Sequence, residues 1–444
     1  EALEFVAQRL KKIVERSGPR TVGFLGSNRT TNEENYLLAR FARTVVGTNN
    51  LDHHRTADFA ALAGALHGEP VRYAASGDLS RASAILLVGN DPTHNHPLLA
   101  WNIRSAVRQR GAHLYIINSR RIKLRRQARQ LVEIPSGKEA AAIEALHDAP
   151  TDISAATQQE LAKLRAALEK ESDVIVLFGA EVFGSAVSRL VEFSRQLPGV
   201  TRYIALGDYA NSRGAADMGL LPDRLPGYAS LKDALTRKKW EQVWGAALPS
   251  EPGLHAKQML GGNQLRALYV IGSNPVKTFG LPQTREALGE LELLVVHELF
   301  LTETARLADV VLPAASAYEK DGTFTNTCGE VQRLKRALDP GAVRTDFEII
   351  RLLSYAWGTP LPLRSSEAAF EEIRQHVRGY RISQAQLLAG QAVRCAPTSG
   401  RAQTDTPPGL VFSADDSLFT SGTLGRYSAA LNSVSERDLP RSRL

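Results

Sequence analysis

Cysteine is rare in this sequence, and the spacing of its cysteines and paired histidines is unfavourable for binding a metal. The two cysteines, Cys328 and Cys395, lie far apart, whereas a cubane iron–sulfur cluster or a structural zinc site takes about four ligands, most of them at short spacings. The adjacent histidines 53–54 would point to different faces of a helix or strand, and the alternate histidines 94–96 have no third ligand nearby. We therefore expect no metal site built by these residues and no disulfide framework.

Serine nucleophiles are not indicated either. Ser27, Ser119 and Ser273 lie in turns that follow apolar runs, but none of them lies in the Gly-x-Ser-x-Gly turn of an α/β-hydrolase. A hydrolase of that class therefore has little support.

Gly, Asn and Asp residues cluster directly after several apolar runs. The clusters are Leu25-Gly-Ser-Asn28, Val88-Gly-Asn-Asp91, Ile117-Asn-Ser119 and Ile271-Gly-Ser-Asn274. In open parallel sheets, ligands bind at the carboxyl ends of strands, where loops meet helix N-termini, so these loops have the composition to hold phosphates or a pterin. Each one alone also has an ordinary explanation, because tight turns favour Gly and Asn.

Such loops would be positioned by short apolar strands that alternate with amphipathic helices, the pattern of parallel α/β sheets. Strands are predicted at residues 21–25, 84–88, 113–117, 132–134, 173–177, 203–206, 267–271, 293–297 and 310–312. Helices are predicted at residues 1–14, 31–45, 98–110, 138–146, 157–170 and 182–196. Two similar segments, Ala84–Pro92 and Ala267–Pro275, predict two related α/β units, and no short repeat indicates a solenoid.

Composition and charge exclude several classes of protein. The 444 residues are more than one hydrophobic core usually serves. No apolar run approaches the roughly 18–20 residues of a membrane-spanning helix, so we expect no direct membrane insertion.

Part of the net charge of +7 lies in Arg104–Arg129. No aromatic residue interleaves with its densest part, Arg120–Arg126, as a stacking platform requires, so we expect no nucleic acid partner. An anionic cofactor, a partner subunit or solvation explains the charge better.

The two ends predict a piece of a longer protein. Residue 1 is Glu, and Glu1–Val14 has the pattern of the middle of an amphipathic helix, so we expect a fragment whose N-terminus lies upstream. Ala396–Leu410, rich in Pro, Thr, Ser and Gly, predicts a linker. Residues 409–412 and 418–424 are expected to dock as short elements, and the polar end at 435–444 is expected to fray.

Ordered motifs across residues 1–360 resemble the molybdopterin oxidoreductase family. In chain order they are Asn32–Tyr36 with Gly47–Asn50, Val88–Pro92 with Asn95–Pro97, Pro135–Lys138, Gly272–Pro275, Thr302–Pro313, and Glu319–Asn326 ending near Gln332. The resemblance implies an α/β fold with two interleaved, doubly wound, three-layer domains. Residues 1–54 plus 250–375 would form a discontinuous domain, residues 55–249 an inserted domain, and residues 376–444 a linker and wrapping tail.

Within that family, finer features resemble the large iron–sulfur subunit of bacterial respiratory complex I. They are residues 51–58, 210–222, 225–228 and 422–432, and the tail is too short for the barrel that caps the cofactor of typical molybdenum enzymes. The resemblance implies a scaffold part of a subunit that supports electron transfer from NADH to quinone at the cytoplasmic face of the inner membrane. Its partners would be other peripheral-arm subunits. Iron–sulfur clusters would belong to an upstream region, while this fragment would hold no cofactor, supply no catalytic residue and be inactive alone.

The same resemblance identifies a pterin-dinucleotide groove, which we expect to be vestigial. Its residues would be Gly89, Asn90, Asp91, His96, Asn118, Arg120, Gly272, Asn274, Glu319, Gly322, Thr323 and Asn326. Asn118 stands where the family has an Asp that pairs with a guanine edge, and the loss would leave buried donors unmatched, although Arg120 could still hold a phosphate. We expect an empty or reused groove rather than bound molybdopterin guanine dinucleotide.

Four residues near this groove have competing interpretations. The molybdenum ligand of the family would fall around Thr56–Phe59, where Asp58 is an available oxygen donor, but Asp58 also fits the N-cap of a helix beginning at Phe59. We expect the N-cap and no metal. His96 is expected to pin its turn to backbone groups. Glu319 and Lys320 are expected to join the domains, with a surface ion pair as the simpler alternative.

Two other functions remain open. One is a molybdopterin-dependent oxidoreductase, such as a formate dehydrogenase catalytic subunit with Asp58 on the metal. The other is a non-redox scaffold that reuses the fold. Molybdenum or tungsten content tests the first, and the cysteine spacing of the upstream sequence tests the second.

Overall fold

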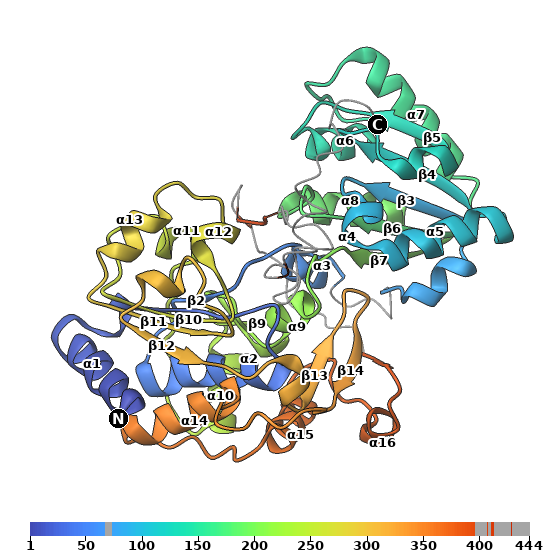
Figure 1. The fold of residues 1–444 in the computed structure, drawn as a ribbon. Coiled ribbons are helices and arrows are strands. Elements are labelled where there is room, and N and C mark those ends of the chain that lie inside the picture. The colour runs from blue at the N-terminus through green and yellow to red at the C-terminus, as the bar shows by residue number, and fades with distance from the viewer. Residues whose placement is uncertain (67–72, 396–405, 407–409, 413–427, 429–444) are drawn as a thin grey trace.

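The computed structural model describes residues 1–66, 73–395, 406, 410–412 and 428. Two five-stranded, all-parallel sheets organise it (Figure 1). The first has the order β12-β11-β10-β1-β2 and consists of β1 Val22–Leu25, β2 Leu51–Asp52, β10 Ala267–Ile271, β11 Leu293–Glu298 and β12 Val310–Pro313. The second has the order β5-β4-β3-β6-β7 and consists of β3 Ala84–Val88, β4 His113–Asn118, β5 Ala128–Glu133, β6 Asp173–Phe178 and β7 Val200–Ala205.

Helices cover both faces of each sheet, so the predicted α/β fold class is confirmed. On the first sheet, one face packs on α1 Ala2–Ser17, α2 Asn32–Arg40 and α14 Asp346–Trp357. The other face packs on α11 Ala256–Met259, α12 Pro275–Thr278 and α13 Thr284–Gly289. On the second sheet, α3 Phe59–Ala65, α6 Glu139–Ala145, α7 Ala155–Leu168 and α8 Ser185–Arg195 cover one face. The other face is covered by α5 Pro97–Arg110, which follows the short helix α4 Pro92–Asn95.

Local signals set the ends of the helices that matter for the site. Thr31 and Glu34 form a capping box at the start of α2, in which the Glu34 N–H donates to Thr31 Oγ1 and the Thr31 N–H donates to Glu34 Oε2. Pro97 occupies the first turn of α5, and Gly111 ends this helix in the left-handed conformation.

The segment that leads back from the second sheet to the first packs mainly on the first. It comprises α9 Ser212–Asp217, β8 Arg224–Leu225, β9 Ala229–Ser230 and α10 Ala234–Trp244, and Met218, Leu225, Trp240 and Trp244 belong to the core of the first sheet. At the return, a Cβ on Gly253 would lie 1.9 Å from the Asn49 carbonyl oxygen, so only glycine fits there. The boundary predicted at residue 249 stays a prediction, and the residues before it contribute to both cores, since Ala216, Leu221 and Tyr228 belong to that of the second sheet.

A small antiparallel sheet lies beside the first unit and was not predicted. It consists of β13 Gly322–Thr325, β14 Glu330–Leu334 and β15 Val393–Arg394, with α15 Ser366–His376 and α16 Gln384–Leu388 near it (Figure 1). Apart from residues 406, 410 and 428, the predicted linker 396–410 and residues 418–424, 422–432 and 435–444 lie outside the described residues. Phe412, within the predicted docking element 409–412, does dock: its N–H donates to the Arg55 carbonyl at 2.7 Å, and its ring packs on Phe279.

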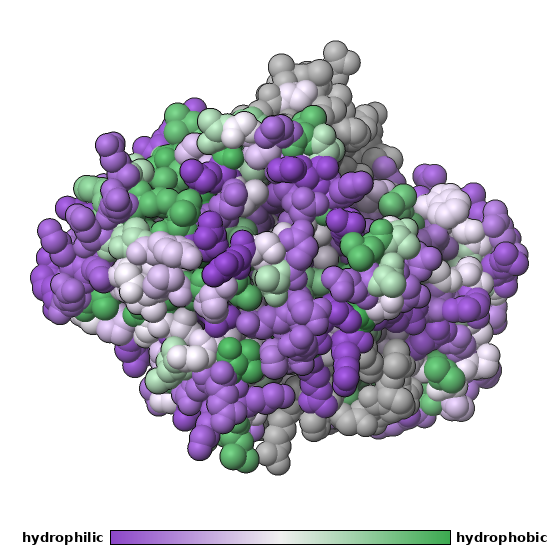
Figure 2. Space-filling view, turned by 90° about the horizontal axis from the view of Figure 1, so that it is seen from below, coloured by the Kyte–Doolittle hydropathy of each residue, from purple (hydrophilic) through white to green (hydrophobic). Residues whose placement is uncertain are grey.

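On the face that carries α10, α14 and α15, hydrophobic residues form small groups among hydrophilic ones (Figure 2). Among the described residues, no helix has both the length and the apolar composition needed to cross a bilayer.

Candidate functional site

A cleft of about 300 Å³ opens at the carboxyl ends of the first sheet's strands. Residues that follow four of these strands line it: Arg29 and Thr30 after β1, Gly272 after β10, Leu299 after β11 and Ser316 after β12. The opposite wall is Asp208–Ala210, from the loop after β7 of the second sheet. The cleft therefore lies where parallel sheets place their ligands, between the two units.

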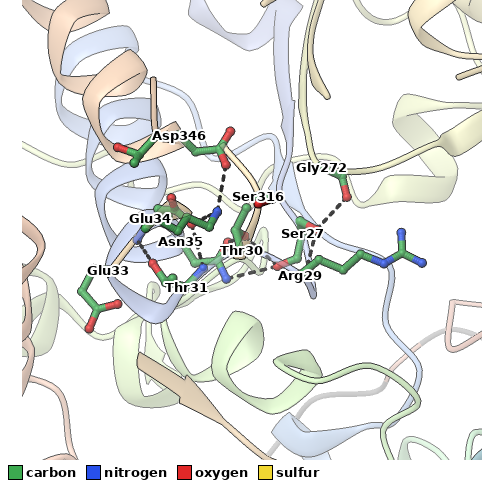
Figure 3. A network of polar contacts seen from close by, with 12 residues as sticks. Ser27, Arg29, Thr30, Thr31, Glu33, Glu34, Asn35, Gly272, Ser316 and Asp346 are labelled. Atoms are coloured by element: carbon green, nitrogen blue, oxygen red, sulfur yellow. Dashed lines mark hydrogen bonds and ion pairs between the residues drawn. The ribbon is translucent and has the colours of Figure 1, made fainter. Parts of the chain in front are cut away.

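The loop after β1 is fixed by its own hydrogen bonds (Figure 3). Ser27 Oγ donates to the Gly272 carbonyl at 2.7 Å, and Asn35 Nδ2 donates to the Ser27 carbonyl at 3.1 Å. Thr30 Oγ1 donates to Asn35 Oδ1 at 2.7 Å. The Arg29 side chain extends away from this network (Figure 3) and stacks over the Tyr209 ring at 4.7 Å. The cleft thus has a rigid floor and one cationic side chain held on an aromatic face.

A buried chain of charged groups lies under the cleft. Lys320 Nζ donates to Glu34 Oε2 at 2.8 Å and to Asp346 Oδ2 at 3.2 Å. His297 Nδ1 lies 3.0 Å from Asp346 Oδ1, and its other ring nitrogen meets the Tyr269 hydroxyl. Burial alone would lower the pKa of Lys320, but Glu34 and Asp346 outweigh it and raise this pKa. We conclude that Lys320 is a protonated cation that links α2 to α14.

A second cavity of about 10 Å³ adjoins the first and is lined by Asn28 and His54. Within the described part of the chain, Asn28 Oδ1 and His54 Nε2 have no hydrogen-bond partner. Burial lowers the pKa of His54 to about 3, and His53 and Arg29 add to this effect. His54 is therefore neutral, and this corner offers polar atoms that a water molecule or a ligand could satisfy.

Asp58, at the position that corresponds to the family's metal ligand, is hydrogen-bonded to the backbone through both carboxylate oxygens. Asp58 Oδ1 accepts the Ala61 N–H at 3.0 Å as the N-cap of α3, and Asp58 Oδ2 accepts the Gly184 N–H at 2.9 Å. Both carboxylate oxygens are thus used by backbone donors, as the N-cap interpretation predicted. In the described part of the chain, no group of three or more His, Cys, Asp or Glu side chains is placed to hold a metal.

The predicted groove residues of the second sheet lie together but bond mainly to one another. Asn118 Nδ2 donates to the Asn90 carbonyl at 2.7 Å, and Asn118 Oδ1 accepts the Arg120 N–H at 2.9 Å. Asn90 follows Gly89 in a turn with positive φ at both residues, and Asp91 caps α4 through the Thr93 N–H. The Asn118 side chain therefore stabilises its own loop. It is an amide, in place of the carboxylate that the family directs at a guanine base.

The expectation for His96 was wrong. Its Nε2 lies 3.3 Å from Asp208 Oδ1, and its neighbour Asn95 donates to this carboxylate at 3.2 Å. Within the described residues His96 Nε2 makes no hydrogen bond, so Asn95 rather than His96 bonds the loop after β3 to the loop after β7, and no bond from the His96 side chain caps its own turn. Asp208 is 112 residues away from His96 in sequence (208 − 96), so no local pattern could reveal it.

The predicted groove residues of the first sheet and the hairpin mainly hold loops in place. Asn274 Oδ1 accepts the Thr304 hydroxyl at 2.7 Å, and Asn326 Oδ1 accepts the N–H groups of Cys328 and Glu330, each at 3.0 Å. Of all the predicted groove residues, only Gly272 lines the two cavities described above. The predicted groove residues do not include four side chains that line the cleft: Arg29, Tyr209, Lys320 and Asp346.

The simpler interpretation of Glu319 and Lys320 as a surface ion pair was wrong, whereas their packing against an upstream cluster-binding domain stays a prediction. Glu319 accepts the Ser316 N–H at 2.7 Å, whereas Lys320 is buried among carboxylates of α2 and α14, which pack on the same sheet. The contact between the two units is made a few residues later. The Thr325 N–H donates to Asn211 Oδ1 at 2.8 Å, and Thr327 Oγ1 accepts the Gly207 N–H at 2.8 Å.

Glu33 is a buried carboxyl group whose contacts are all neutral donors. Its two oxygens accept the Thr323 N–H at 2.8 Å and the Thr323 hydroxyl at 2.7 Å, and a Cβ on Gly322 would lie 2.8 Å from Glu33 Oε2. Burial raises the pKa of Glu33 from 4.5 to about 7, against these hydrogen bonds. The folded state therefore binds this proton more tightly than the unfolded chain does.

This pKa predicts that the wild-type protein loses stability as the pH rises from about 4.5 through 7. Glu33→Gln removes that titration and is expected to raise the free energy of unfolding at pH 8, by at most about 3 kcal/mol, with little change at pH 4.5. Denaturant unfolding at both pH values measures the effect, and the exposed Glu290→Gln is the control. If wild type and Glu33→Gln show the same pH dependence, Glu33 does not titrate in this range.

Comparisons with known proteins agree with this architecture. Residues 1–356 match the molybdopterin oxidoreductase family. The chain is 31% identical to the F420-dependent formate dehydrogenase subunit alpha of Methanocaldococcus jannaschii, over 86% of this chain and 63% of that protein. It is also 31% identical to a subunit of an NADH-quinone oxidoreductase of Rhizobium meliloti, over 98% of this chain and 56% of that protein.

Among solved structures, acetylene hydratase from Pelobacter acetylenicus has a similar fold. The TM-score is 0.60 at 16% identity, covering 89% of this chain and 63% of that one. The first curated relatives are matched over only 41–63% of their own length. The match over residues 1–356 is most of the chain, and the paired parallel sheets and the cleft at their strand ends accord with it. The chain therefore belongs to the molybdopterin oxidoreductase family.

Proposed function

We propose that this chain is the scaffold part of an iron–sulfur subunit of an NADH:quinone oxidoreductase. In this role it supports electron transfer from NADH to quinone and contacts other subunits of the peripheral arm. The complex would stand at the cytoplasmic face of the bacterial inner membrane. The chain would contribute shape and docking surface, while the clusters would be held by a region upstream of residue 1.

The observation that carries this proposal is the hydrogen bonding of Asp58. A molybdenum centre needs a protein donor or an open coordination position at this place, and a carboxylate ligand needs a free oxygen lone pair directed at the metal. Asp58 directs both oxygens at backbone N–H groups of Ala61 and Gly184. The residues present therefore do not fit a metal held from this position, and we derive no reaction step through one.

The cleft also favours a role without pterin. Its volume of about 300 Å³ is at the lower limit of pockets for drug-sized ligands, and a pterin dinucleotide is larger. On the second sheet, the loops that the family uses for the dinucleotide close on themselves through Asn118. The similarity to a component of an NADH-quinone oxidoreductase extends over 98% of this chain, which supports the same assignment.

A molybdopterin-dependent oxidoreductase, such as a formate dehydrogenase, is the second candidate. One observation favours it: Asn28 Oδ1 and His54 Nε2 are buried beside the cleft, and within the described residues neither has a hydrogen-bond partner. A bound heterocycle would satisfy such atoms. A water molecule would also satisfy them in the cavity of about 10 Å³.

Metal and pterin analysis of the full-length protein separates these candidates. We expect iron in the purified protein but less than about 0.1 molybdenum or tungsten atom per chain, because both Asp58 oxygens are already directed at backbone N–H groups. We also expect no fluorescent pterin after acid oxidation, which measures the organic part separately. Stoichiometric metal together with pterin would overturn the scaffold proposal, and the absence of both iron and upstream cysteine motifs would favour a non-redox scaffold.

A further inference from the structure

A cluster of cations surrounds a hollow on the outer side of the second unit. The hollow has a volume of about 380 Å³, and it is lined by Arg104 and Arg108 of α5 and by Arg121, Lys123, Arg125 and Arg126 of the loop between β4 and β5. Arg121 pairs with Glu133. For the other five cations, no ion pair is found within the described parts of the chain. So many like charges around one depression repel one another, and an anionic partner would relieve that repulsion.

Two large apolar side chains stand exposed on the same helix. Leu98 is 79% and Trp101 is 64% exposed. Trp101, Arg104 and Arg108 are spaced by three and four residues, so they share one face of α5. The opposite face carries Leu99, Ile103 and Ala106, which are buried against the sheet. Within the described residues, the fold therefore packs one face of α5 on the sheet and leaves exposed a face that combines an indole with guanidinium groups.

This combination fits a protein partner better than a small anion or a nucleic acid. Trp and Arg are the residues most enriched at the energetic centres of protein interfaces, and a small phosphate compound would gain nothing from Leu98 and Trp101. A single-stranded nucleic acid needs several aromatic side chains along its path, whereas the lining of the hollow contains none. Complementary charge also speeds and orients the association of proteins.

We propose that this surface, defined by Leu98, Trp101, Arg104, Arg108 and the basic loop 121–126, docks an acidic face of another protein subunit. Carboxylates of the partner occupy the hollow, and an apolar patch of the partner covers Trp101 and Leu98. The inference rests on the charge and exposure of these side chains and holds whichever electron-transfer function the chain serves.

Site-specific cross-linking in the native cell tests the proposal on the full-length protein. Trp101 is replaced by the photo-cross-linker p-benzoylphenylalanine, and the same substitution of Leu235, which is 82% exposed on α10, serves as the control. We expect one protein to be cross-linked at position 101, through an apolar patch that lies beside Asp and Glu residues, at a yield at least about tenfold above position 235. Cross-links to RNA, to lipid or to a protein surface without acidic residues beside the cross-linked site would overturn the proposal, and so would equal yields at the two positions.

Charge reversal provides the second measurement. Arg104→Glu with Arg108→Glu is compared with Lys238→Glu and Lys239→Glu, which make the same change of charge on an exposed part of α10. We expect the first pair to lower the cross-link at position 101 at least about tenfold, and added salt to have the same effect on the wild type. The control pair should leave the yield unchanged. If both pairs lower it equally, the binding depends on total charge and not on this surface.

Discussion

Lys320→Met is expected to lower the free energy of unfolding by about 3–5 kcal/mol, because it leaves two buried carboxyl groups without their cation. Glu34 and Asp346 are both buried, and Lys320 Nζ lies within 3.2 Å of each. Met fills a similar volume, so the loss reports the missing charge rather than a cavity. Denaturant unfolding of the wild type and the variant at pH 7 measures the difference.

The pH dependence of this variant has a definite sign. In the wild type, Lys320 and the His297 hydrogen bond lower the pKa of Asp346, although burial opposes them. Without the cation, burial dominates and raises the pKa of both carboxyl groups, so the folded variant prefers their protonated forms. The destabilisation by Lys320→Met should therefore shrink as the pH falls from 7 towards 4.5.

Two further variants make the interpretation of this experiment specific. Lys320→Met combined with Glu34→Gln removes one of the stranded charges and should recover part of the lost stability. Lys335→Met, at an exposed position after β14, should change the free energy of unfolding by less than about 0.5 kcal/mol. A loss for Lys320→Met as small as that of Lys335→Met would show that the buried ion cluster contributes little.

The parallel strands could be predicted because burial on both faces makes each of them a continuous apolar run. Ala84–Val88 and Ala267–Ile271 begin and end where the sequence pattern placed them. β2 was missed since it has only two residues, Leu51 and Asp52, too few for any period. The hairpin of β13 and β14 was missed because its inward positions include Thr323 and Thr325, whose hydroxyls hydrogen-bond to Glu33 and Tyr380 instead of forming an apolar face.

The site was less predictable than the fold, since its contacts join residues far apart in sequence. Asn32–Tyr36 contains two glutamates, and such a segment normally marks a solvated helix face, yet all of it is buried. Glu34 needs Lys320, and Glu33 needs Thr323, to be buried in this way. The family motifs pointed to the correct loops but not to the side chains that face the cleft, because strand-end Asn and Gly serve turns as readily as ligands.

Arg43→Met is expected to have an effect as large as that of Lys320→Met, a loss of about 3–5 kcal/mol in the free energy of unfolding. Arg43 is fully buried in the π-helical segment Phe41–Val46. Its guanidinium donates to the carbonyl oxygens of Gly219, Leu221 and Arg224 and to Asn49 Oδ1, at distances between 2.7 and 3.0 Å. Met would leave these buried acceptors without donors.

The geometry of the guanidinium, and not only its charge, carries this prediction. Arg43 reaches four acceptors because its donors form a planar fork, whereas the ammonium group of lysine is a single point. Arg43→Lys should therefore lose a substantial part of the stability that Arg43→Met loses, although it keeps the charge. Arg20→Met, at an exposed position, is the matched control and should be nearly neutral. If Arg43→Lys unfolded at the same denaturant concentration as the wild type, the prediction would be wrong. The planar guanidinium would then not be what holds residues 219–224 to the first sheet.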